Sequence, residues 1–176
     1  MSNALKTLLS VLFVLCLLTV PLFNPRLLAQ TNNEGISNLE VSGEKGIFLN
    51  SVYQSDRAVR HFEDSVMIAD GWRSSTHLKA IQQLWYVDSL NTLKIDQYLD
   101  DHGYPDKENF SNDARVAPWK VLLHSLNKEV RRKHFNDLYD AYKDGDLETR
   151  RFLLFLEDEY QRERLISVDG TSESSV

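Results

Sequence analysis

Apolar side chains recur at three- and four-residue spacing along most of the chain between residues 47 and 166. This spacing places them on one face of an α-helix, and helices of this kind pack their apolar faces together. No pair of alternating segments indicates a β-hairpin, and no repeat of solenoid length is present in the sequence. The pattern predicts an all-α fold: a single small helical bundle or an orthogonal array of about five helices.

Helix-breaking and helix-capping residues divide this region into the five expected helices. The first spans about residues 47–68 and ends before Gly71, and the second spans about residues 75–101. Gly103 ends the second helix, because a glycine readily takes the left-handed conformation that closes a helix. Pro118 fits the first turn of a third helix, while Asn127 and Asp146 are suited to cap a fourth and a fifth.

The two ends of the chain differ from this region. Lys6 is the only charge before an apolar run from Leu8 to Val20, and Ala29 suits the position before a cleavage site, which predicts a signal peptide over residues 1–29. An uncleaved membrane anchor is the alternative, although the run is shorter than the roughly 20 apolar residues of a typical span. Polar composition predicts a flexible leader over residues 30–46 and a disordered tail over residues 167–176, on either side of an all-α domain at 47–166.

Charge and cysteine content exclude several classes of function. Of 20 basic and 26 acidic side chains, Lys6 and Arg26 leave with the signal peptide, so the mature net charge is −8. An acidic surface repels nucleic acid and anionic lipid, so we expect no nucleic-acid partner and no membrane contact beyond the signal segment. Cys16, the single cysteine, lies in the signal segment. The sequence shows no full set of metal ligands, so we expect neither a metal nor a cofactor.

Two aspartates occupy positions where the helical pattern favours apolar side chains. Asp56 lies in the first expected helix and Asp88 in the second, where an ionised carboxylate is costly unless it is paired. Arg60 and Asn91 follow them by about one helical turn, and His124 ends the apolar run of the third helix. We expect these five residues to converge in one polar cluster.

The cluster has two interpretations. It is either a buried network that sets helix register, or a pocket in which a shifted pKa equips a residue for chemistry. In the second interpretation His124, Asp88 and Asp56 are the candidate catalytic residues, and Arg60 and Asn91 the candidate binding residues. The basic run at residues 131–134 is interpreted separately, as a solvated helix face.

Several short motifs resemble those of a bacterial family of uncharacterised helical domains. The motifs are Asp-Ser-Leu-Asn-Thr at 88–92, His-Gly-Tyr-Pro at 102–105 and His-Ser at 124–125, which match a D-x-x-N-T, H-G-aromatic-P and His-Ser pattern. The resemblance covers about residues 56–159. Leu123 stands where the family has glutamine, and the family's closing Tyr-Gly segment is absent. The resemblance implies a helical domain and supports the choice of polar residues, but it implies no activity.

These observations favour an exported binding or interaction module of the cell envelope, periplasmic or extracellular, whose partner is an unknown protein or small-molecule ligand. The alternative is a hydrolase or lyase-like enzyme in which His124 acts as general base, Asp88 or Asp56 orients it, and Arg60 holds an anionic group. A solvent-open pocket with His124 and Asp88 within hydrogen-bond reach would favour the enzyme. A dry, closed cluster would favour the binding module.

Overall fold

The computed structural model describes residues 33–170, with side chains for residues 35–164. Every regular element in this part of the chain is an α-helix, which confirms the all-α prediction. The helices are α3 (Asn33–Ser37), α4 (Ser42–Asp70), α5 (Ser75–His102), α6 (Asn112–His124), α7 (Lys128–Lys133), α8 (Phe135–Asp144) and α9 (Thr149–Gly170). None of them is long and apolar enough to cross a membrane. The predicted signal peptide lies outside the described residues.

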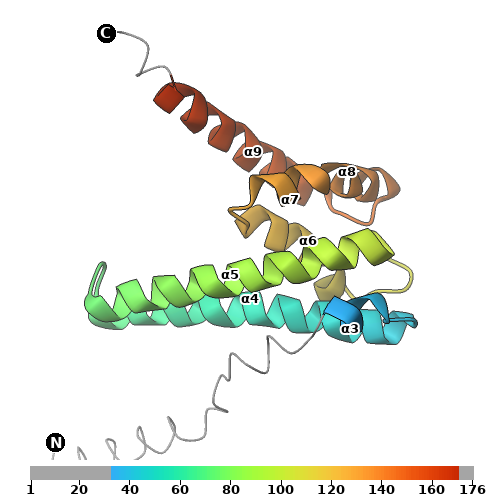
Figure 1. Ribbon diagram of the computed structural model, residues 1–176, viewed down its shortest axis with the longest axis horizontal. Coiled ribbons are helices and arrows are strands. Elements are labelled where there is room, and N and C mark those ends of the chain that lie inside the picture. The colour runs from blue at the N-terminus through green and yellow to red at the C-terminus, as the bar shows by residue number, and fades with distance from the viewer. Residues whose placement is uncertain (1–32, 171–176) are drawn as a thin grey trace, which may run out of the picture. The chain divides into compact units, whose positions relative to one another are not determined.

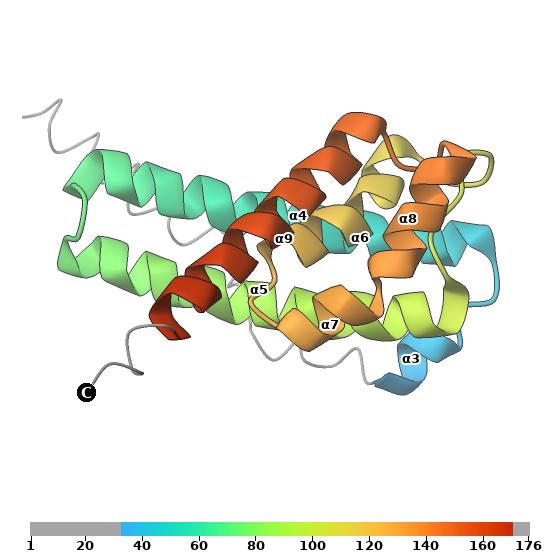
Figure 2. The ribbon, with the colours of Figure 1, turned by 90° about the horizontal axis from the view of Figure 1, so that it is seen from above.

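Helices α4 and α5 form a long antiparallel hairpin (Figures 1 and 2). Gly71 and Arg73 both take left-handed backbone conformations in the connecting turn, with φ of +87° and +62°. The fully buried His77 stabilises this turn, because its Nδ1 accepts a hydrogen bond from the Arg73 N–H (3.0 Å). Its Nε2 contacts Glu63 Oε1 at 2.6 Å and so ties α5 back to α4.

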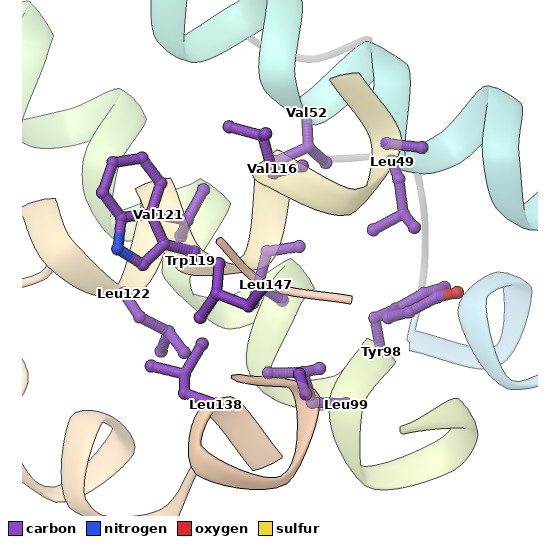
Figure 3. Packing of buried hydrophobic residues seen from close by; sticks show 14 of the residues in the cluster. Leu49, Val52, Tyr98, Leu99, Val116, Trp119, Val121, Leu122, Leu138 and Leu147 are labelled. Carbon is purple, nitrogen blue, oxygen red and sulfur yellow. The ribbon is translucent and has the colours of Figure 1, made fainter. Parts of the chain in front are cut away.

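Helix α6 packs against both arms of the hairpin and completes the core with residues from α8 and α9. Figure 3 shows side chains from these elements meeting in one cluster. Fully or almost fully buried members include Leu49, Val52, Ile95, Tyr98, Leu99, Ala114, Leu122, Leu138 and Phe155. Because these residues come from five helices, the core depends on long-range packing rather than on any one helix pair.

The third expected helix starts earlier than its proline suggested. Ser111 caps α6 by accepting a hydrogen bond from the Ala114 N–H (3.3 Å), so Pro118 lies inside the helix and not in its first turn. Proline lacks the N–H that would bond to the carbonyl four residues earlier, here that of Ala114. Pro118 is buried, and removal of its apolar ring from water offsets part of that loss.

The fourth expected helix is divided into α7 and α8 at His134. This buried histidine contacts Asp137 Oδ2 through Nδ1 (2.7 Å) and Asp96 Oδ1 through Nε2 (2.8 Å). The first contact reaches the first turn of α8, and the second reaches α5. This division and the additional helix α3 give the described region seven helices where about five were expected.

The domain limits also differ from the prediction. The expected flexible leader contains α3 and the first turn of α4, because Ile36 is buried in the core and its carbonyl accepts a hydrogen bond from His102 Nε2 (2.8 Å). This segment was not predicted to be ordered, because one buried apolar residue and a few hydrogen bonds give no periodic apolar pattern in the sequence. At the other end, α9 continues to Gly170, so the expected disordered tail begins inside a helix.

Candidate functional site

Asp56 is the centre of a polar cluster between α4, α5 and α6. Asp56 lies on the same buried face of α4 as Val52 and Val59, so its carboxylate points inward. His124 Nδ1 lies 2.9 Å from Asp56 Oδ1, and the Arg60 Nε–H donates to the same oxygen at 3.1 Å. Lys120 Nζ forms an ion pair with Asp56 Oδ2 at 3.2 Å.

Arg60 connects this centre to α5. Its Nη2 donates a hydrogen bond to Asp88 Oδ1 at 2.7 Å and lies 3.0 Å from Asp56 Oδ1. Four of the five predicted residues therefore meet, although His124 bonds to Asp56 and not to Asp88. Asn91 is the exception: it is buried, and its Nδ2 has no hydrogen-bond partner among the described residues. Asn91 thus does not join the other candidate residues.

The two carboxylates differ in their acidity. Burial raises the pKa of Asp56, but hydrogen bonds and charges from His124 and Arg60 outweigh it and lower that pKa to about 2. Burial also raises the pKa of Asp88, and there the attraction of Arg60 is too weak to reverse the effect. Asp56 is therefore ionised at neutral pH, so the proton of the shared hydrogen bond belongs to His124 Nδ1.

An open groove of about 610 Å³ begins at this cluster. Arg60, Asp88 and His124 line it, and α9 forms the opposite wall with Leu154, Glu157, Asp158, Gln161 and Arg162. Figure 1 shows α9 diverging from α5 along its C-terminal half. A neighbouring hollow of about 300 Å³ continues along α5 and shares Trp85, Asp88 and Leu126 with the groove.

Large apolar side chains around the groove are exposed to solvent. Trp85 is 56% exposed, Leu126 73% and Leu154 42%. Trp85 follows the apolar period of α5, which by itself favours a place in the core. In the structure the buried face of α5 follows His77, Val87 and Ile95 instead, which leaves Trp85 turned toward the groove.

Arg131 fixes the α9 wall in place. Its side chain is 2% exposed, it forms an ion pair with Glu159, and its Nη2 donates to Asp158 Oδ2 at 2.5 Å. Its Nη1 donates to the carbonyl oxygens of Leu123 (3.0 Å) and Ser125 (3.2 Å) at the end of α6. The prediction of a solvated basic face was therefore wrong for Arg131, which is buried with Val130.

His124 presents a ring nitrogen to the groove. Its Nδ1–H is held by Asp56, and its Nε2 makes no hydrogen bond to the described residues, although the side chain is 25% exposed and lines the groove. The neighbouring Ser125 is not available as a nucleophile, because it is buried and its Oγ accepts from the Asn127 N–H at 3.1 Å. The geometry supports acid–base chemistry or binding, without a nucleophile.

A second group of ligand-type side chains lies between α5 and α7. Potential ligand atoms of Asp96, Asp100 and His134 lie within 4.8 Å of one another. Lys133 Nζ contacts both carboxylates, at 2.8 Å and 2.5 Å, and both nitrogens of His134 already contact carboxylates. Lys133 thus supplies the positive charge that a metal ion would bring.

Comparison of this chain with protein-family models, with curated proteins and with solved structures finds no match. The resemblance to uncharacterised bacterial helical domains therefore remains a prediction.

Proposed function

We propose that the protein is a binding module of the cell envelope, active after export, and that it holds an apolar segment of a partner protein in the groove between α5 and α9. The observation that carries this proposal is the group of exposed apolar residues Trp85, Leu126 and Leu154 around a groove of about 610 Å³. Full burial of a large apolar side chain contributes roughly 1.5–3 kcal/mol, and interfaces concentrate their binding energy in such residues.

The floor of the groove adds directional contacts to this apolar surface. His124 Nε2 has no hydrogen-bond partner among the described residues, and Arg60 reaches the groove from its pairing with Asp56 and Asp88. The Arg60 guanidinium donates hydrogen bonds, so this part of the groove complements a carboxylate or a backbone carbonyl. The fitting partner is an apolar segment that carries an acidic or carbonyl group.

Two adjacent leucines of α9 provide a matched test. Leu153 and Leu154 are 57% and 42% exposed, but only Leu154 lines the groove. The probe is 8-anilinonaphthalene-1-sulfonate, which combines an apolar ring system with an anionic group. We expect saturable binding, weakened about tenfold or more by Leu154→Glu and little changed by Leu153→Glu. Fluorescence titration measures both affinities, and circular dichroism verifies that the variants remain folded.

Equal weakening by the two glutamates, or no saturable binding by the parent protein, would contradict the proposal. A photo-crosslinking residue placed at position 154, with position 153 as control, then identifies the natural partner in the cells that make the protein. A specific adduct is expected at 154 alone.

The hydrolase or lyase-like alternative is favoured by one observation, the Asp56–His124 pair on the wall of an open groove. A buried carboxylate that holds a histidine by Nδ1 leaves Nε2 available as a base. Under this alternative, His124→Gln abolishes turnover of a chromogenic ester or lyase substrate while leaving binding of the fluorescent probe largely intact. A turnover rate that His124→Gln leaves unchanged would exclude it.

A further inference from the structure

A basic hollow lies over α4 and α6, distinct from the groove and sharing only Arg60 with it. Its volume is about 460 Å³, and its lining includes three permanent cations, Arg57, Arg60 and Lys120, together with His61 and Asp64. The whole chain has 26 acidic and 20 basic side chains. A local excess of positive charge thus runs against the overall composition.

The cations of this hollow converge from two helices. Arg57 Cζ of α4 lies 5.7 Å from the centre of the Tyr53 ring, and Lys120 Nζ of α6 lies 5.2 Å from the same centre. The ring face attracts each cation, but two like charges gathered on one ring also repel each other. An anion bound in the hollow would offset part of that repulsion.

Nearby carboxylates offset two of the three cations, because Arg60 pairs with Asp56 and Asp88 and Lys120 pairs with Asp56. Asp56 is shared by Lys120, Arg60 and His124. Arg57 forms no ion pair with any described residue. Its guanidinium therefore keeps its hydrogen-bond donors free for a ligand, and guanidinium groups bind phosphate oxygens in pairs.

We propose that this hollow binds the phosphate group of a small soluble ligand, with Arg57 and Lys120 as its main contacts. Two sources share this chemistry, a free phosphate compound and the headgroup of an anionic lipid. The acidic net charge of the protein opposes approach to an anionic membrane, so the soluble source is favoured. Asp64, at the same hollow, repels the ligand and limits its affinity.

The test uses inorganic phosphate as the probe and a matched pair of arginine variants. Arg150 is exposed on α9, like Arg57 on α4, and it lines none of the described hollows. We expect saturable phosphate binding at constant ionic strength, followed by the arginine Nε–H signals in NMR spectra. Arg57→Gln should weaken it about tenfold, the loss typical of a charge-assisted hydrogen bond, and Arg150→Gln should change it less than twofold. Because Arg57 has no ion pair to lose, its replacement leaves the fold intact.

Asp64→Asn should change the affinity for phosphate in the opposite direction. Removing this negative charge should tighten phosphate binding about twofold to threefold. Equal effects of Arg57→Gln and Arg150→Gln, or weaker binding by Asp64→Asn, would overturn the proposal. So would binding to phosphatidylglycerol vesicles that depends on Arg57 in the absence of free phosphate binding, since a membrane would then be the ligand.

Discussion

At the scale of single residues, Asp56 and Asp88 illustrate how environment separates two similar side chains. Both carboxylates interrupt an apolar face, and both pair with Arg60. Asp56 contacts Arg60, Lys120 and His124. Asp88 has Arg60 as its one ion-pair partner among the described residues. Their pKa values therefore move in opposite directions. Asp56 is the residue on which the cluster depends.

We expect Asp56→Asn to destabilise the protein by about 2 kcal/mol at pH 7, since that is the linkage value of a pKa lowered from 3.8 to about 2. A lowered folded-state pKa stabilises the fold above the unfolded value of 3.8, and this contribution disappears as the pH falls toward 2. The free energy of unfolding of the parent should fall by that amount between about pH 4 and 2. The free energy of unfolding of Asp56→Asn should not show this fall. Urea denaturation at a series of pH values measures both.

Asp88→Asn is the control for this prediction. The raised pKa of Asp88 means that its ionised carboxylate is disfavoured in the folded protein, so at neutral pH it lowers the stability instead of raising it. Asparagine keeps an acceptor for Arg60 while removing that cost, so stability at pH 7 should change little or rise slightly. A loss at Asp88→Asn as large as at Asp56→Asn would show that the two carboxylates support the cluster equally.

At the scale of secondary-structure elements, the position of α9 decides whether the groove exists. Arg131 connects α7 to Asp158 and Glu159 of α9 and to the last carbonyls of α6. Arg162 of α9 adds a contact to the Leu123 carbonyl at 3.3 Å. The apolar packing of Phe152 and Phe155 anchors the N-terminal part of α9, and these polar contacts hold its middle.

Arg131→Met should therefore destabilise the fold by about 3 kcal/mol, because it leaves two carboxylates and two carbonyls without their buried donor. Backbone amides of α9 beyond residue 157 should exchange with solvent faster. Arg132→Met is the matched control, since Arg132 is the next residue and its pairing with Glu163 is exposed. Hydrogen exchange read by mass spectrometry compares the two. Equal exchange in both variants would mean that apolar packing alone positions α9.

At the scale of the whole molecule, the predicted export would determine where the groove and the basic hollow operate. The apolar run from Leu8 to Val20 and the small Ala29 motivate the prediction that the mature chain starts near Gln30. Mass spectrometry of the protein made in a bacterial host should show a form lacking residues 1–29. A stable product that retains Met1 to Val20 would contradict cleavage and favour the membrane-anchor alternative.

Local patterns in the sequence predict the helical class, the main helix ends and four members of the polar cluster. These features follow from local rules: apolar spacing defines helices, Gly71 and Gly103 end them, and Asp56 and Arg60 lie one turn apart. The same rules explain why an aspartate between Val52 and Val59 points inward. Each of these inferences needs only residues within a few turns of one another.

Packing between distant helices sets which side chains meet in the cluster and which helix faces remain exposed. Nothing local separates buried Arg131 from exposed Arg132, because Arg131 is buried through its contacts with α9, which crosses the hairpin (Figure 2). The local pattern likewise does not show that Trp85 is exposed at the groove. Asn91 follows the local pattern and still lacks a contact with the cluster. Burial is set by packing between distant segments, and helical periodicity carries no information about which segment covers a given face.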